Sequence, residues 1–282
     1  MIPLSILSQL SDAPVVSQSP VNGGSINECF QVKLADGQSF FLKRNKLHEF
    51  PGMFLAEKKG LELLAQSGAP TPTVLACWEE EPHQFLLQEY LVPQISSNKD
   101  WEKAGIHLAQ LHQTTADSFG LDHTNYMGSL MQRNNFCSSF HEFFIVYRLG
   151  DQIRIARDTS LLQSAHIRAF ERLFLRLDEL IPSEKPALIH GDLWTGNVHE
   201  TQRGIYFIDP AISFNHRETD LAMSQLFGKL PDEFYRAYHD AFPLEQDWQK
   251  RIAIFNLYPL LIHLNLFGQS YLSSIEEVLK RF

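Results

Sequence analysis

The chain has 282 residues, 44% hydrophobic and 20% charged, a composition typical of globular proteins that excludes a disordered or repeat protein. Its formal net charge of −9 argues against nucleic acid or an anionic membrane as a partner. Three cysteines, Cys29, Cys77 and Cys137, form no metal-ligand spacing and no disulfide framework, so we expect a cytoplasmic protein. The N-terminus lacks an export signal and no apolar run reaches about 18 residues, which predicts neither export nor a membrane span.

The first residues predict strands around a glycine turn. Residues 1–12 are compatible with a short helix, and residues 15–30 are expected to be extended apart from Asn22-Gly-Gly-Ser25. Glycines between two strands let the backbone approach a ligand, and free N–H groups there could bind phosphate, although a plain hairpin turn is the ordinary interpretation. Further strands are predicted at 30–34 and 39–43, on either side of an Asp36-Gly37 turn. The candidate cofactor-binding residues are therefore Gly23, Gly24, Ser25 and, beneath that turn, Lys43.

A helix over residues 52–66 is predicted next, because apolar residues recur at helical spacing until Gly68 and two prolines end it. An ammonium that holds phosphates needs a carboxylate to orient it. Glu57 is the first choice as the partner of Lys43, Glu62 is the alternative, and a solvent-facing glutamate is the ordinary interpretation of either. Strands at 73–78 and 84–90 follow. Five strands and this helix match the N-terminal lobe of a kinase.

Residues 88–93 are expected to connect two lobes, which we place at residues 1–91 and 92–282. Backbone groups of this connector, around Glu89 and Leu91, would contact the adenine edge of a nucleotide. An amphipathic helix is predicted at 98–114. A long ordered loop is expected at 117–140, and such loops are often functional. Helices are predicted around 141–156 and 160–180.

The most informative stretch is Ala187-Leu-Ile-His-Gly-Asp-Leu-Trp-Thr-Gly-Asn197, followed by Gly204-Ile-Tyr-Phe-Ile-Asp-Pro210. It predicts a strand, a polar loop with Asp192 and Asn197, and a second strand that ends at Asp209. An aspartate base beside amide and carboxylate oxygens suits a bound Mg²⁺ ion, which prefers such ligands together with phosphate. The preceding His190 and the second strand reproduce the catalytic-loop and metal-aspartate pattern of kinases. The alternative is a polar turn between two buried strands.

Asp220, at the start of a predicted helix, could accept hydrogen bonds from the catalytic-loop backbone. Residues 231–282 predict helices separated near Pro243 and Gly268.

Two features of the sequence indicate which class of kinase this is. Protein kinases have an arginine where this chain has Gly191, and that arginine contacts a phosphorylated activation loop. Only seven residues separate Asp209 from Arg217, too few for such a loop. The acceptor is therefore expected to be a small molecule or an exposed side-chain adduct.

These motifs resemble those of the fructosamine kinase (ketosamine 3-kinase) family. The resemblance lies in His190-Gly-Asp-Leu-Trp-Thr-Gly-Asn197, Asp209-Pro210, His216-Arg-Glu-Thr-Asp-Leu-Ala222 and Leu264-Asn-Leu-Phe-Gly268. Gly23-Gly-Ser-Ile-Asn27, Lys43 and the segment from Phe119-Gly to Met127-Gly-Ser129 extend it over essentially the whole chain. Trp194 favours this family over the aminoglycoside and choline kinases, which share His-Gly-Asp and the later asparagine.

The resemblance implies an α+β, two-lobed, protein-kinase-like fold of the aminoglycoside-phosphotransferase type. Its N-terminal lobe would hold a five-stranded antiparallel sheet and a helix, and its C-terminal lobe would be mainly helical. It also implies ATP-dependent phosphorylation of the third-carbon hydroxyl of a ketosamine, free or on a glycated protein, which would serve deglycation.

In that family's chemistry Asp192 would be the base, and Asn197 and Asp209 would hold Mg²⁺. Lys43, positioned by Glu57, would neutralise charge on ATP. Trp194 would pack against the sugar or, about equally well, anchor the core. The alternatives are a kinase of an aminoglycoside or choline-like alcohol, and a nucleotide-binding regulator without transfer activity.

Overall fold

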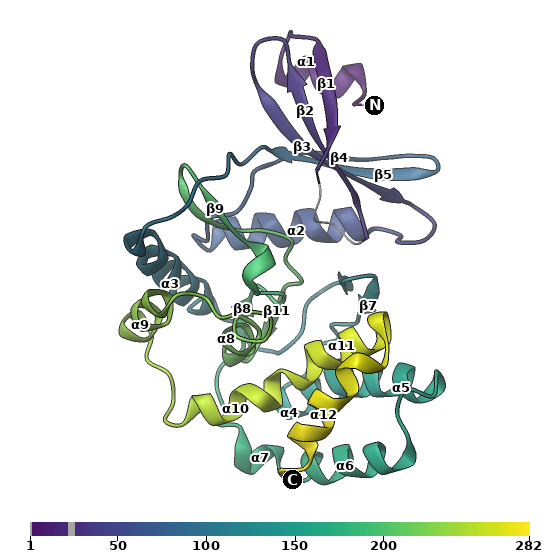
Figure 1. Ribbon diagram of the computed structural model, residues 1–282, viewed down its shortest axis with the longest axis vertical. Coiled ribbons are helices and arrows are strands. Elements are labelled where there is room, and N and C mark those ends of the chain that lie inside the picture. The colour runs from purple at the N-terminus through teal and green to yellow at the C-terminus, as the bar shows by residue number, and fades with distance from the viewer. Residues whose placement is uncertain (1, 22–25) are drawn as a thin grey trace.

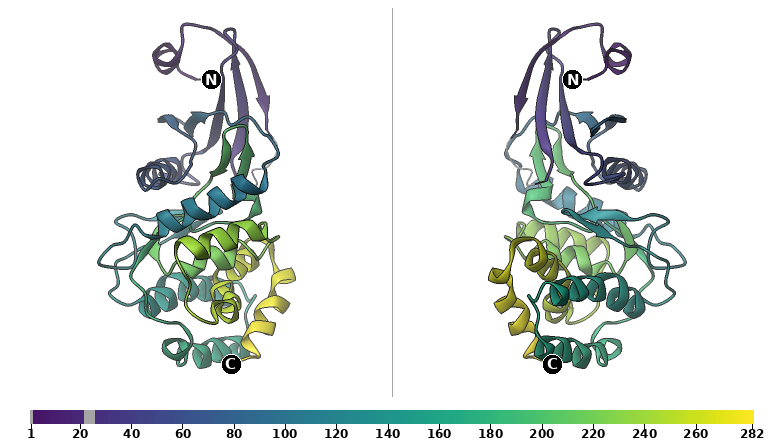
Figure 2. Two further views of the ribbon diagram at one scale, coloured as in Figure 1. Left: turned by 90° about the vertical axis from the view of Figure 1, so that its left-hand side faces the viewer. Right: turned by 90° about the vertical axis from the view of Figure 1, so that its right-hand side faces the viewer.

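The computed structural model describes residues 2–21 and 26–282 (Figure 1). The predicted phosphate-binding residues Gly23, Gly24 and Ser25 lie outside the described residues. A β-sheet occupies one end of the elongated molecule and helices occupy the other, with the two chain termini at opposite ends (Figures 1 and 2). This arrangement agrees with the expected α+β fold with a helical C-terminal part.

The N-terminal sheet has five antiparallel strands in the order β1-β2-β3-β5-β4. Their bounds are β1 (Val15–Pro20), β2 (Glu28–Leu34), β3 (Ser39–Lys46), β4 (Val74–Glu80) and β5 (His83–Glu89). The β2–β3 turn is the predicted Asp36-Gly37 turn, in which Gly37 has φ +91° and the Asp36 carboxylate accepts the Gln38 N–H. Helix α1 (Leu4–Leu10) and helix α2 (Met53–Gln66) lie beside this sheet.

Alternating side chains of the sheet pack into two apolar clusters. Leu42 and Leu87 belong to the cluster that includes residues of the α1 segment, whereas Leu86 packs with Met53 and Phe54 of α2. Leu42 of the middle strand β3 is therefore fixed on one face of the sheet. This placement also fixes Lys43, which lies opposite Cys29 on β2 and Leu86 on β5.

The connector after β5 runs along the hairpin of β9 (Val198–Thr201) and β10 (Gly204–Phe207), where the Gln94 N–H donates to the Glu200 carbonyl. Helix α3 (Asn98–His112) then begins with a capping box between Ser97 and Asp100. Helix α9 (Asp232–Ala241) crosses α3 so closely that a Cβ at Gly105 would stand 2.2 Å from the Phe234 carbonyl oxygen. The expected lobe boundary at residues 91 and 92 would fall in this connector and stays a prediction.

Residues 117–140 were expected to form a long ordered loop, and the structure adds two short strands within it. They contain a hairpin of β6 (Asn125–Met127) and β7 (Leu130–Gln132), with Gly128 at φ +61° in its turn. Each strand has only three residues, too few for an alternating pattern to be recognised in the sequence.

The helix predicted around residues 141–156 is nearly right, whereas the single helix predicted around residues 160–180 is wrong. The helix expected around 141–156 is a continuous run of α4 (Phe140–Phe143), the π-helical segment η1 (Phe144–Gly150) and α5 (Asp151–Asp158). Instead of one helix over 160–180, the chain forms α6 (Ser164–Phe174) and α7 (Leu177–Leu180). The α-helical bonding stops between them, where the Arg176 N–H donates to the Leu173 carbonyl three residues back at 2.9 Å and Arg176 has φ −114°.

The remaining elements surround the predicted catalytic loop and complete the largest apolar cluster. Strand β8 (Ala187–Ile189) pairs with β11 (Ser213–Asn215), and η2 (Thr195–Asn197) follows the loop. The helices are α8 (Glu218–Met223), α10 (Trp248–Phe255), α11 (Leu257–Phe267), η3 (Gln269–Tyr271) and α12 (Leu272–Leu279), so the expected breaks near Pro243 and Gly268 are present. Within the described residues, no helix combines the length and the apolar character that crossing a membrane requires.

Candidate active site

The predicted catalytic loop is held by a buried carboxylate. After β8, the backbone N–H groups of His190 and Gly191 donate to the two oxygens of Asp220, at 2.7 and 2.9 Å. This is the scaffold contact expected for Asp220. The same carboxylate lies 3.1 Å from Nε2 of His112, whose Nδ1 is 2.8 Å from the Tyr238 hydroxyl. Sequence reasoning gave His112 no role, because a histidine on a helix carries no pattern that reveals such partners.

Gly191 allows a close contact that no other residue permits. Its φ is +84°, and a Cβ at this position would stand 2.0 Å from the backbone oxygen of Ala211. The two segments are also joined by the Ala211 N–H, which donates to the His190 carbonyl at 2.9 Å. The contact explains in steric terms why this chain has glycine where protein kinases have arginine.

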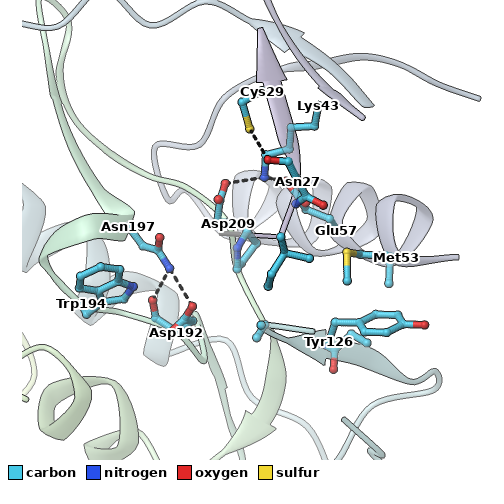
Figure 3. A pocket seen from close by; sticks show the side chains of 16 residues that line it. Asn27, Cys29, Lys43, Met53, Glu57, Tyr126, Asp192, Trp194, Asn197 and Asp209 are labelled. Atoms are coloured by element: carbon cyan, nitrogen blue, oxygen red, sulfur yellow. Dashed lines mark hydrogen bonds and ion pairs between the residues drawn. The ribbon is translucent and has the colours of Figure 1, made fainter. Parts of the chain in front are cut away.

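Asp192, Asn197 and Asp209 line one cavity (Figure 3). The Asn197 amide nitrogen donates to the backbone oxygen and to Oδ2 of Asp192, both at 2.9 Å. These bonds turn the Asn197 amide oxygen away from Asp192 (Figure 3). Asp209 has φ +54°, in the left-handed region that residues other than glycine rarely adopt. The loop therefore brings three oxygen-bearing side chains together, as the spacing suggested.

The environment of Asp192 suits a proton acceptor. Burial raises the pKa of this carboxyl to about 7, the nearby charges of Asp209 and Asp220 act in the same direction, and the hydrogen bond from Asn197 opposes them. A base is most effective when its pKa lies near the working pH. Asp192 is thus placed to exchange a proton near neutrality, while its role in a reaction stays a prediction.

Lys43 joins the N-terminal sheet to Asp209. Its ammonium lies 2.6 Å from Oε1 of Glu57 on α2 and 2.7 Å from Oδ1 of Asp209. Burial by itself lowers the pKa of Lys43, but the two carboxylates outweigh it, so the pKa is raised and the side chain stays charged. The alternative partner, Glu62, lies instead near Lys58 on the helix surface.

Trp194 both lines the cavity and packs on the C-terminal part of the chain. Its indole folds over Gly196, where a Cβ would stand 2.4 Å from the ring. On another side the indole meets Phe227 edge-to-face, with ring centroids 6.1 Å apart. Both predicted roles of Trp194, contact with a sugar and anchoring of the core, are thus compatible with its position.

Glu89 ends β5 and Leu91 lies in the connector that follows, and both are absent from the lining of this cavity. The Glu89 carboxylate accepts the Thr73 N–H at 2.9 Å and pairs with Arg203, and Leu91 is buried. Their side chains therefore hold the connector, and only backbone groups remain for the expected adenine contact, which stays a prediction.

Several lining residues had been given no role from the sequence, although five of them lie in the two segments quoted for the family resemblance: Ile26, Asn27, Asn125, Tyr126 and Gly128. Three more come from other parts of the chain and share no spacing that could have revealed them: Met53, Ala56 and Ala211. Cys29 also lines the cavity, and burial raises the pKa of its thiol to about 11, so it is protonated and unreactive.

A five-stranded sheet with a lysine–glutamate pair, linked to a helical part that carries the His-Gly-Asp loop, defines the protein-kinase-like fold. Solved structures confirm it. A candidate fructosamine-3-kinase from Thermobifida fusca is 34% identical and superposes with a TM-score of 0.88 over 98% of this chain and 96% of that one. The kinase hAmiN, solved with AMP-PNP, Ca²⁺ and amicoumacin, is 15% identical with a TM-score of 0.61 over 100% and 94% of the two chains, a likeness of fold alone.

The family model described as fructosamine kinase matches residues 4–282, and the chain belongs to that family. A probable ketoamine kinase of Enterococcus faecium is 39% identical over 266 residues, covering 93% of this chain and 94% of that one. The probable ketoamine kinase YniA of Escherichia coli is 32% identical over 97% and 95% of the two chains. The resemblance stated from the motifs is thus confirmed, and with it the assignment of the chain to a family of small-molecule kinases.

Proposed function

We propose that this protein is an ATP- and Mg²⁺-dependent phosphotransferase that phosphorylates the third-carbon hydroxyl of ketosamines, free or on glycated protein side chains, and so serves deglycation. The observation that carries the proposal is that Asp192, Asn197, Asp209 and the Lys43–Glu57 pair surround one cavity. The names of the relatives, ketoamine kinase and fructosamine-3-kinase, support the acceptor class. Free thiols at all three cysteines fit the proposed cytoplasmic location.

The residues present fit a magnesium–nucleotide complex. The Asn197 amide oxygen points away from Asp192, and Asp209, whose side chain is 45% exposed, contacts Lys43 through only one of its oxygens. Hard oxygen ligands of this kind suit Mg²⁺. The hAmiN neighbour was solved with AMP-PNP and Ca²⁺, and the aminoglycoside kinase APH(2″)-IIa was solved with ATP. When bound, ATP would supply the phosphoryl group and Mg²⁺ would neutralise charge on the phosphates.

In this scheme Asp192 orients the acceptor hydroxyl and accepts its proton, with the carboxylate fixed by the amide of Asn197. Lys43 places a positive charge beside Asp209, where nucleotide phosphates would lie, and Glu57 holds that ammonium in position. Gly23, Gly24 and Ser25 would cover the phosphates, and the connector backbone at Glu89 and Leu91 would contact adenine. Positioning and electrostatics supply the rate, since phosphoryl transfer needs little covalent help.

A coupled ADP-release assay across fructoselysine, ribuloselysine, choline and aminoglycosides tests the acceptor class. We expect turnover with the two ketosamines only. Turnover confined to choline or aminoglycosides would replace the proposal with another small-molecule kinase. Binding of Mg²⁺·AMP-PNP without any turnover would favour a nucleotide-binding regulator.

Asp192→Asn tests the proposed base. We expect normal binding of Mg²⁺·AMP-PNP and a loss of turnover of about 100-fold or more. Asp240→Asn, at an exposed helix position, is the matched control and should keep full activity. Near wild-type turnover in Asp192→Asn would remove this residue from the mechanism.

A further inference from the structure

The β6–β7 hairpin is anchored to the C-terminal part of the chain by a buried network of amides. The Asn125 amide nitrogen donates to the Ile212 carbonyl, and Gln132 and Asn134 each donate to the Asn125 amide oxygen, all at 2.8 Å. Each of these three side chains is at most 4% exposed. Arg148 and Tyr258 donate in turn to Asn134 and Gln132, at 2.6 and 2.7 Å. A satisfied buried network of this kind holds the hairpin in one position.

The other side of the hairpin contacts the N-terminal part. The Tyr126 hydroxyl donates to the backbone oxygen of Pro51 at 3.0 Å. Its ring meets Phe50 edge-to-face, with centroids 6.5 Å apart and an interplanar angle of 85°. Pro51 immediately precedes Gly52, the N-cap residue of α2. Tyr126 thus contacts the N-terminal end of α2, near Met53 (Figure 3).

Helix α2 carries Glu57 about one turn after Met53, and Glu57 holds Lys43. The helix also touches the C-terminal part at a second place, where a Cβ at Gly60 would stand 3.4 Å from a side-chain carbon of Pro210, next to Asp209. Besides its packing on the sheet, α2 is therefore held by two contacts with the C-terminal part, and the one through Tyr126 lies on the cavity wall.

We propose that Tyr126 is a positioning residue that ties the start of α2 to the β6–β7 hairpin. Through this tie, Glu57 and Lys43 keep their place relative to Asp192 and Asp209. Tyr126 and Asn125 form one wall of the cavity. This wall then moves together with the Lys43–Glu57 pair, as one rigid body. The effect of this contact on phosphoryl transfer rests on the proposed function. The contact itself, and its effect on the position of α2, do not.

Hydrogen exchange of the α2 backbone amides tests the contact between Tyr126 and α2, and it needs no phosphoryl-acceptor substrate. Tyr126→Phe removes only the hydroxyl, and the loss of one hydrogen bond should speed exchange at residues 56–61 about fivefold. Exchange in α11 should not change. Tyr206→Phe is the control, because the Tyr206 hydroxyl has no hydrogen-bond partner among the described residues. Unchanged α2 exchange in Tyr126→Phe, or an equal increase in Tyr206→Phe, would overturn the proposal.

Phe50→Leu weakens the same contact from the N-terminal part of the chain. It replaces Tyr126→Phe as the test if Tyr126→Phe does not fold. It should also speed exchange at residues 56–61, and with Tyr126→Phe in the same chain the two effects should not add, because the residues touch. Additive effects, or unchanged α2 exchange in Phe50→Leu, would contradict a shared contact.

Turnover of fructoselysine supplies the functional readout. Tyr126→Phe should lower kcat severalfold in the wild-type background and have no further effect in Glu57→Gln, since the tie acts through Glu57. An equal loss in both backgrounds would mean that Tyr126 acts otherwise, and the proposal would fail. If no ketosamine is turned over, the proposed function fails, and the exchange experiment decides the tie alone.

Discussion

Replacing Gly191 with alanine tests the steric argument for the catalytic loop. The φ of +84° alone costs alanine about 1–2 kcal/mol. The new Cβ would also lie 2.0 Å from the Ala211 backbone oxygen, so the two segments must separate. Separation weakens the bond from the Ala211 N–H to the His190 carbonyl, worth about 1 kcal/mol, and strains the bond from the Gly191 N–H to the Asp220 carboxylate, worth about 1.5–3 kcal/mol.

Gly37→Ala is the matched control because Gly37 has φ +91° and a Cβ there would meet nothing within 4 Å. Gly37→Ala therefore introduces the same backbone strain without a steric clash of the new Cβ. We expect Gly191→Ala to be less stable than Gly37→Ala by roughly 2–4 kcal/mol, or about 3–7 °C in Tm for a chain of this size.

Thermal unfolding of the two variants and the wild type provides the assay, and turnover measured below the lower Tm shows whether Asp192 is displaced. We expect Gly191→Ala to lose most of its activity and Gly37→Ala to keep it. Tm values for the two variants within about 2 °C of each other would refute the reasoning, because the clash with Ala211 would then cost nothing measurable.

With Asp192 as the proposed base, its pKa of about 7 predicts that kcat/KM falls about tenfold per pH unit below about pH 7, because the base must be deprotonated. A profile flat between about pH 5.5 and 8 would contradict this. Burial lowers the pKa of His216 to about 4, so the unfolded chain takes up a proton below about pH 6.5 that the folded chain refuses, and stability falls as the pH drops towards 4. His216→Asn should lose about 2 kcal/mol less between pH 7 and 5 in urea titrations, and an equal loss would exclude this cause. Gly196→Ala should displace the Trp194 indole at a cost of about 1–3 kcal/mol, seen as a changed near-UV circular dichroism spectrum, and an unchanged spectrum would rule out the close packing.

The sequence was most predictive where the number of residues between two side chains determines the distance between them in the folded protein. The hairpin of β9 and β10 is short, so Asn197 at its start and Asp209 just past its end must come close together, and the pattern of polar residues located them. The strand–turn–strand signal around Asp36-Gly37 placed Lys43 in the same way. These features are local, and local geometry can be derived from residue types and their order.

Contacts between distant segments were beyond such reasoning. Nothing in a tyrosine within an irregular stretch indicates that its hydroxyl reaches Pro51, 75 residues away in the chain. The partners of His112 lie 108 and 126 residues away.

The segment from Asp209 to Ile212 shows why this chain lacks the mobile metal loop of protein kinases. The Ile208 N–H donates to the Asn197 carbonyl at 3.0 Å and the Ala211 N–H donates to His190 at 2.9 Å, so the strained Asp209 is held between two fixed points. Pro210 adds its own rigid φ and packs near Gly60 of α2. A left-handed aspartate persists only where its surroundings impose it. Asp209 is therefore preorganised beside Lys43.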